Sequence, residues 1–83
     1  MSLSGERKVV VYVTPLCASC ERLKAYLHSH DVAFSVKDLM MDEAAAKLLE
    51  SRSIRAMPAL EVDGEIVAGQ ALHKDKIDAM LGL

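Results

Sequence analysis

The stretch KVVVYVTPLCASC, residues 8–20, decides the fold. Its first half, residues 8–13, is a run of β-branched residues, which is typical of a buried strand in the centre of a parallel sheet. Pro15 ends this strand and introduces a loop. From position 17 or 18 to about position 30, the apolar side chains recur at helical spacing. The stretch therefore predicts a strand, a short loop and a helix, with Cys17 where the loop meets the helix.

The rest of the chain continues the alternation of strands and helices. Val32, Phe34 and Val36 occur at every second position, which predicts a strand. Asp42 suits a helix N-cap, and the alanine-rich segment after it has high helix propensity. The pair Asp63-Gly64 is the strongest two-residue signal of a hairpin turn. The predicted elements after the first helix are a strand over 32–38, a helix over 44–50, strands over 59–62 and 65–68, and a helix over 74–81.

This order, β-α-β-α-β-β-α, predicts the fold class. Right-handed crossovers make the first two strands parallel neighbours, and the closing hairpin extends the same sheet. We therefore predict an α/β domain of three layers, in which helices cover both faces of a four-stranded mixed sheet. Cys17 then lies at the carboxyl end of the first strand, where such sheets place their sites. The predicted domain covers residues 8–83, and residues 1–7 form a flexible N-terminal segment that is compatible with a cloning leader.

Length and composition exclude several functional classes. The 83 residues have room for one small domain. Ten basic and twelve acidic residues give a net charge of −2, which offers no broad basic surface for nucleic acid. No apolar run approaches the roughly 20 residues of a membrane span, and the polar start is not a signal peptide. We therefore expect a protein that binds neither nucleic acid nor a membrane and that is cytoplasmic, unless a targeting segment has been removed from it. We also expect a monomer.

Cys17 and Cys20 carry the predicted chemistry. They are too close in sequence to stabilise a scaffold, because the loop that they close is tiny. Three positions apart at the start of a helix, they are near enough to form a disulfide. Unpaired N–H groups and the positive end of the helix dipole favour a thiolate at Cys17, so we expect a lowered pKa there. We therefore predict that Cys17 attacks a substrate disulfide and that Cys20 resolves the mixed disulfide.

Three other interpretations of the cysteine pair stay open at this stage. A purely structural disulfide would stabilise a loop this short very little. Half of a zinc site would need ligands from His28, His30 or His73, but the spacing from Cys20 to His28 does not match zinc-finger patterns. A Cu(I) carrier also holds its metal with Cys-x-x-Cys at a strand-to-helix turn. Such domains resemble a β-α-β-β-α-β order and often have methionine where this chain has Pro15, so we predict no metal site.

Met57-Pro58 and Gly69 are candidates for substrate binding. Proline at the start of a strand is compatible with simple strand initiation. A cis bond before Pro58 would free the backbone N–H and C=O of Met57 to pair with an extended partner beside the cysteines. Gly69 ends the pattern of the fourth strand, and its missing side chain would let the backbone approach a ligand closely.

Together these residues resemble the glutaredoxin family of the thioredoxin superfamily. The motifs that carry the resemblance are Cys17-Ala18-Ser19-Cys20, Lys24, Met57-Pro58 and Ala68-Gly69. Residues 11–17 particularly resemble the glutaredoxin-like electron donors of ribonucleotide reductase. The resemblance implies a thioredoxin-like fold, a cis bond at Pro58 and dithiol–disulfide exchange without a tightly bound cofactor. Family members that bridge an iron–sulfur cluster with glutathione often use a single site cysteine, so this remains an alternative that the second cysteine disfavours.

Departures from the family pattern bear on the reductant. Thr14 stands where glutaredoxins commonly have lysine, and Ala56-Met57 stands where they often have Thr-Val. Gly69 is followed by Gln70 and not by the acidic residue that holds the amino group of glutathione in the family. The charged contacts to glutathione are therefore largely absent, although glutathione stays a candidate co-substrate.

We predict a small thiol–disulfide oxidoreductase that reduces protein or glutathione mixed disulfides. Glutathione or a thioredoxin-reductase-like enzyme would restore the dithiol, at a potential of roughly −200 to −270 mV. Besides the catalytic Cys17 and Cys20, the residues assigned to substrate binding are Thr14, Pro15, Leu16, Met57, Pro58, Gly69 and Gln70.

Overall fold

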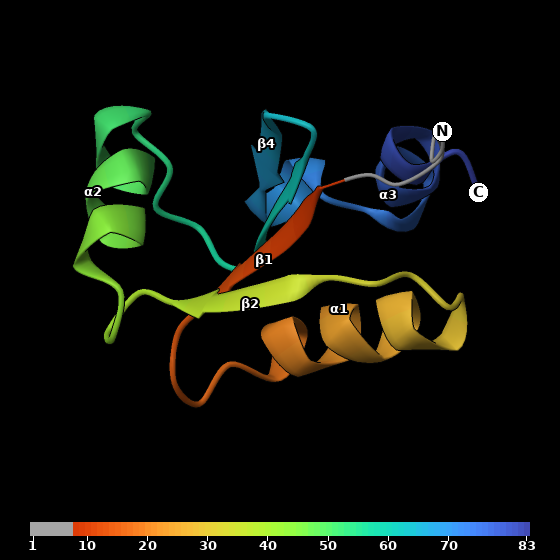
Figure 1. Cartoon of the computed structure of the whole chain (residues 1–83), viewed down its shortest axis with the longest axis horizontal. Coiled ribbons are helices and arrows are strands. Elements are labelled where there is room, and N and C mark those ends of the chain that lie inside the picture. The colour runs from red at the N-terminus through yellow and green to blue at the C-terminus, as the bar shows by residue number, and fades with distance from the viewer. Residues whose placement is uncertain (1–7) are drawn as a thin grey trace.

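The computed structural model describes residues 8–83, so the prediction for residues 1–7 lies outside it. The described chain forms a four-stranded sheet with helices on both faces (Figure 1). The observed order confirms the predicted β-α-β-α-β-β-α and adds one 3-10 helix that the sequence did not predict. The elements are β1 (Val9–Val13), α1 (Ala18–Ser29), β2 (Ser35–Asp38), α2 (Glu43–Ser51), β3 (Ala59–Val62), β4 (Glu65–Ala68), the 3-10 helix η1 (Gly69–Ala71) and α3 (Lys74–Leu81).

The strand order β2-β1-β3-β4 places β1 inside the sheet. β1 runs parallel to β2 and antiparallel to β3, and β3 and β4 form the closing hairpin. All five residues of β1 are buried, because helices cover both faces of the sheet. The prediction of a buried central strand is therefore confirmed, and the end of β1 leads directly into the loop that carries Cys17.

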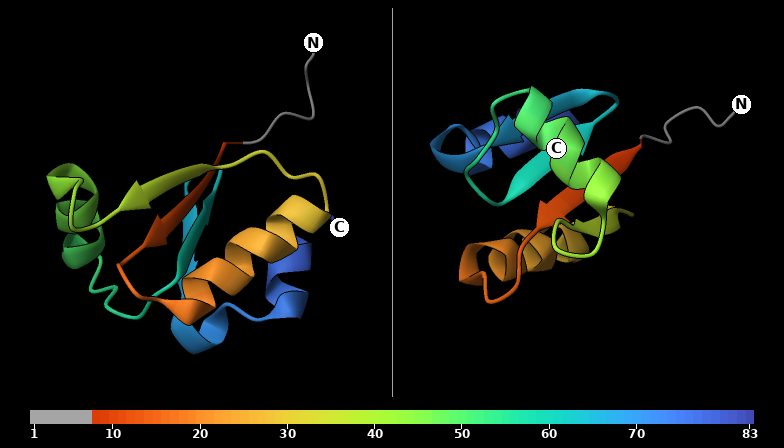
Figure 2. Two further views of the ribbon diagram at one scale, coloured as in Figure 1. Left: turned by 90° about the horizontal axis from the view of Figure 1, so that it is seen from below. Right: turned by 90° about the vertical axis from the view of Figure 1, so that its left-hand side faces the viewer.

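Three layers result from the placement of the helices. α1 and α3 lie against one face of the sheet, and α2 lies against the other (Figure 2). Successive side chains of β1 alternate between these two layers. Val11 packs with Leu27 of α1 and Ile77 of α3, whereas Val10 packs with Leu49 of α2. The buried core of residues 8–83 is mostly aliphatic, and the one aromatic side chain in it is a tyrosine in the α2 layer.

That tyrosine, Tyr12, belongs to a polar pair under α2. Its side chain is 1% exposed, and its hydroxyl donates a hydrogen bond to the half-buried carboxylate of Glu61 on β3. Burial raises the pKa of Tyr12, and the hydrogen bond to Glu61 raises it further. The phenol therefore stays protonated and serves as the hydrogen-bond donor to Glu61.

Local signals explain where the second helix and the hairpin lie. The Asp42 side chain accepts a hydrogen bond from the Ala45 N–H at 3.0 Å, which confirms the predicted N-cap of α2. Asp63 and Gly64 have φ values of 51° and 94°, the positive values that a two-residue hairpin needs.

The predicted strand over residues 32–38 is wrong in its first three residues, since β2 begins at Ser35. The Val32 N–H donates to the Leu27 carbonyl at the end of α1, so it is not available to a strand. Val32 and Phe34 still pack, partly buried, against the core beneath α1 and α3. Their alternation therefore reflects packing against the helices and not strand pairing.

Candidate active site

Cys17 and Cys20 form a disulfide at the N-terminus of α1, with their Cα atoms 5.2 Å apart. Cys17 is the N-cap residue of this helix, and Cys20 lies in its first turn, as predicted. The backbone N–H of Cys20 donates to the Cys17 Sγ at 3.1 Å. An N–H aimed at this sulfur favours a negative charge on it once the disulfide is reduced.

The two cysteines differ in accessibility. Cys20 is 1% exposed and belongs to the core cluster with Val11, Leu23 and Leu60. Cys17 is only partly buried, at the end of the loop that joins β1 to α1. A disulfide-bearing partner can therefore reach Cys17, whereas the apolar core shields Cys20 from it.

Met57-Pro58 is a cis peptide bond, which confirms the geometry that the resemblance implied. Within residues 8–83, no hydrogen bond engages the main chain of Met57. The neighbouring Pro58 carbonyl accepts from the Gly69 N–H at 3.3 Å. Gly69 has a φ of 63°, and a Cβ on it would lie 2.7 Å from the Ala56 Cβ. Glycine is therefore required there because the turn after β4 packs closely against the segment before Pro58.

Two clefts lie on either side of the N-terminal half of α1. The α3-side cleft, of about 670 Å³, lies between α1, the Ala56–Pro58 segment, the turn after β4 and the start of α3. The β2-side cleft, of about 550 Å³, lies between the Val13–Ala18 loop, α1 and β2, and Cys17 is part of its wall.

The residues predicted to bind substrate divide between these clefts. Met57, Pro58, Gly69 and Gln70 line the α3-side cleft. Thr14, Pro15 and Leu16 line the β2-side cleft together with Cys17. Thr14 and Met57 also share a depression of about 290 Å³ that reaches toward α2. The structure thus divides the seven predicted residues between two clefts, and of these only the β2-side cleft has a residue of the cysteine pair, Cys17, in its wall.

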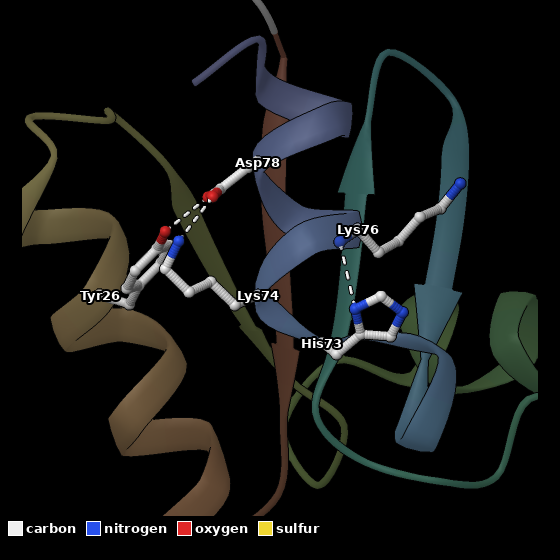
Figure 3. A network of polar contacts seen from close by, with 5 residues as sticks. All are labelled: Tyr26, His73, Lys74, Lys76 and Asp78. Atoms are coloured by element: carbon white, nitrogen blue, oxygen red, sulfur yellow. Dashed lines mark hydrogen bonds and ion pairs between the residues drawn. The ribbon is translucent and has the colours of Figure 1, made fainter.

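A polar network that the sequence analysis did not predict lies at the wall of the α3-side cleft (Figure 3). The Tyr26 hydroxyl of α1 donates to the Asp78 carboxylate of α3 at 2.5 Å, and Lys74 lies 3.0 Å from the same carboxylate. The hydrogen bond from Tyr26 is the main reason that the pKa of Asp78 is lowered, and Lys74 adds to the effect. The network joins the helix of the cysteines to α3. The spacing of Lys74 and Asp78 indicates an ion pair, but nothing local in the sequence links either residue to Tyr26.

Residues 8–83 contain no group of three or more His, Cys, Asp and Glu side chains that could hold a metal ion. Nor does the described chain include a helix long and apolar enough to cross a membrane.

The fold and the cysteine pair define a protein of the thioredoxin-like class, with a Cys-x-x-Cys pair at the start of α1 and a cis-proline directly before β3. Residues 9–67 match the family model described as Glutaredoxin. The chain therefore belongs to the glutaredoxin family, as the resemblance in the sequence implied.

Individual relatives agree with this assignment. The chain is 30% identical over 76 residues to an uncharacterized glutaredoxin-like 8.6 kDa protein from the rubredoxin operon of Clostridium pasteurianum, a match that covers 88% of this chain and 96% of the relative. Among solved structures, the thioredoxin-like protein BC3987 superimposes with a TM-score of 0.78 at 33% identity, covering 89% of this chain and 100% of that one. The Escherichia coli glutaredoxin-like protein NrdH-redoxin, whose activity profile is described as thioredoxin-like, gives a TM-score of 0.70 at 18% identity, over 75% and 82% of the two chains.

Proposed function

We propose that this protein is a dithiol thiol–disulfide oxidoreductase that reduces disulfides in partner proteins through Cys17 and Cys20. The observation that carries the proposal is the asymmetry of the pair. Cys17 is accessible and accepts a backbone N–H at a helix N-terminus, whereas Cys20 is 1% exposed against the core. An accessible thiolate beside a shielded thiol is what ordered attack and resolution need.

The proposed reaction begins with the reduced pair. The Cys17 thiolate attacks one sulfur of the partner disulfide, whose S–S bond breaks as the Cys17–partner bond forms. The other partner sulfur leaves as a thiolate and takes a proton from solvent. Cys20 then loses its proton to solvent and attacks the Cys17 Sγ, and the first partner sulfur leaves as a thiolate that is protonated in turn. The partner gains two electrons and two protons, and the protein is left with the Cys17–Cys20 disulfide.

The segment before Pro58 supports partner binding in this reaction. The unbonded main chain of Met57 offers one donor and one acceptor to an extended partner chain beside the cysteines. Gly69 keeps this segment in place through its hydrogen bond to the Pro58 carbonyl. We assign partner positioning to these residues and electron transfer to the two sulfurs.

An external dithiol or thiol must return the pair to its reduced form. Glutathione and a thioredoxin-reductase-like flavoenzyme are the two candidate reductants, and both belong to a reducing compartment such as the cytoplasm. Thr14 and Gln70 are uncharged where the family commonly carries charged contacts to glutathione. We therefore favour the enzymatic reductant. To decide between the two, we would compare how fast the oxidised protein is reduced by thioredoxin reductase with NADPH and by excess glutathione.

Trapping the mixed disulfide tests the proposed roles. The reduced Cys20→Ser variant, mixed with insulin, should form a stable adduct through Cys17 that mass spectrometry detects. The matched Cys17→Ser variant should form an adduct much more slowly than the Cys20→Ser variant, because its remaining thiol, that of Cys20, is buried. Equal adduct formation by the two variants, or by neither, would contradict the assignment.

A further inference from the structure

The two clefts are separated by α1 itself. Arg22 and Tyr26, four positions apart, face the α3-side cleft. Glu21 and Lys24, three positions apart, face the β2-side cleft with Cys17. A polypeptide whose cysteine is bonded to Cys17 continues on both sides of that cysteine, so one flanking segment can enter the β2-side cleft while the other reaches across α1 to the α3-side cleft.

The α3-side cleft carries one positive charge without an ionic partner. Two cations, Arg22 and Lys74, are part of its wall, and no acidic residue is. The charge of Lys74 is balanced by Asp78 at 3.0 Å. Arg22 donates only to the Ser19 hydroxyl, at 3.1 Å, and forms no ion pair within residues 8–83. Its guanidinium is therefore available to a carboxylate of a bound partner.

The β2-side cleft carries the opposite charge. Lys24 and Glu21 neutralise each other at 2.7 Å. The remaining charge belongs to Asp38 at the end of β2, whose carboxylate accepts from the Met40 N–H at 2.8 Å and has no cationic partner in the described chain. One negative charge is therefore left on the side of Cys17 opposite to Arg22.

Apolar surface in the β2-side cleft points to a protein as the occupant. Leu16, directly before Cys17, is fully exposed, and Val36 is 46% exposed in the same cleft. A partner polypeptide bonded to Cys17 would cover these two apolar side chains, because they line the same cleft as the sulfur. This surface is continuous with Cys17, which must contact any partner that it reduces.

We propose that the partner presents its disulfide in a segment with opposite charges on the two sides of the attacked cysteine: an acidic residue toward Arg22 and a basic residue toward Asp38. This inference rests on the proposed thiol–disulfide exchange and adds a rule of partner selection to it. The charge order along the partner, and not its net charge, is what the two clefts distinguish.

Two peptides of identical composition test the charge order. Both are blocked at their ends and carry a central cysteine activated as a thiopyridyl disulfide, which releases a neutral, absorbing thiopyridone when the reduced protein attacks. One peptide has the order Glu-Ala-Cys-Ala-Lys and the other Lys-Ala-Cys-Ala-Glu. Because exposed charge pairs are weak, we expect the second-order rate constants of the two peptides to differ by about two- to fivefold in low salt. The difference should vanish at about 1 M salt, where charges are screened within about 3 Å.

A double variant assigns the effect to the two residues. Arg22→Gln and Asp38→Asn together remove both charges but keep a donor for Ser19 and an acceptor for Met40. This variant should react equally with the two peptides. The matched control, Glu43→Gln with Lys47→Gln on α2, removes the same two kinds of charge outside both clefts and should keep the wild-type preference.

Each outcome is decisive. Equal rates for the two peptides with the wild-type protein would overturn the inference while leaving the exchange activity intact. A preference that persists in the Arg22→Gln, Asp38→Asn variant would overturn it as well. Absence of thiopyridone release from both peptides would overturn the proposed function and the inference together.

Discussion

Replacing Gly69 with alanine tests how closely the turn after β4 packs against the segment before Pro58. Gly69 has a φ of 63°, a left-handed conformation in which alanine costs about 1 kcal/mol. The added Cβ would lie 2.7 Å from the Ala56 Cβ, so one of the two segments must move. Overpacking of this kind costs about 1–3 kcal/mol. Gly69→Ala should therefore lower the free energy of unfolding by about 2–4 kcal/mol.

Two further variants separate the backbone cost from the steric cost. Gly64 has a φ of 94°, but a Cβ there would meet no atom within 4 Å. Gly64→Ala should therefore lose about 1 kcal/mol from backbone strain alone. Adding Ala56→Gly to Gly69→Ala removes the clash, so the double variant should recover about 1 kcal/mol or more relative to the sum of the single changes.

Urea unfolding of the three single variants and the double variant measures these terms, provided that the m-value stays constant. For a chain of this size, about 1 kcal/mol corresponds to about 4–8 °C in Tm. A coupling energy near zero between Ala56→Gly and Gly69→Ala would show that the steric cost of Gly69→Ala does not come from contact with Ala56. The Gly69→Ala variant should also reduce insulin more slowly, since the Gly69 N–H holds the Pro58 carbonyl.

Three other substitutions each remove one side-chain hydrogen bond. Asp42→Ala removes the N-cap of α2 and should lower Tm by about 4–8 °C in a thermal melt, whereas Asp42→Asn, which keeps the acceptor, should lower it much less. Tyr12→Phe should cost about 1–3 kcal/mol in urea unfolding because it leaves Glu61 without its donor. The pKa of Tyr12 is raised in the folded state, so its contribution to the free energy of unfolding is complete below about pH 10 and declines as the pH rises above that. The Tyr12→Phe variant should not show this decline in stability at alkaline pH. Tyr26→Phe should raise the pKa of Asp78, measured by NMR titration of the carboxyl group. The variant should therefore lose less stability than the wild-type protein when the pH falls below about 4. An unchanged Asp78 titration would contradict the role given to Tyr26.

Local signals in the sequence were sufficient for most of the secondary structure. The β-branched run before Thr14 predicts a strand because such side chains fit a sheet that is buried on both faces. Asp42 and the Asp63-Gly64 pair act through bonds and dihedral angles within a few residues, so their effects can be read locally. The strand predicted from Val32 failed because period-two burial also arises where an irregular segment packs against a helix.

The sequence indicated which residues to assign to the candidate site, but not how they are arranged in space. Cys17, Cys20 and the Met57-Pro58 pair follow from motif chemistry. The placement of Cys17 in one cleft and of Met57-Pro58 in the other depends on the strand order β2-β1-β3-β4, which brings β2 and β3 to opposite sides of β1. The bond between Tyr26 and Asp78 spans 52 positions, and no local pattern predicts such a contact. The 3-10 helix after β4 is too short to have a periodic signal.

The sulfur at the helix N-terminus should ionise more readily than the sulfur one turn later. The most direct measurement is the pH dependence of iodoacetamide alkylation of the fully reduced protein, with each cysteine followed separately by peptide mass spectrometry. Cys17 should be alkylated faster and with an apparent pKa below that of an unperturbed cysteine, while Cys20 should react slowly throughout. Alkylation of the two cysteines at equal rates, or a lower apparent pKa at Cys20, would contradict this prediction.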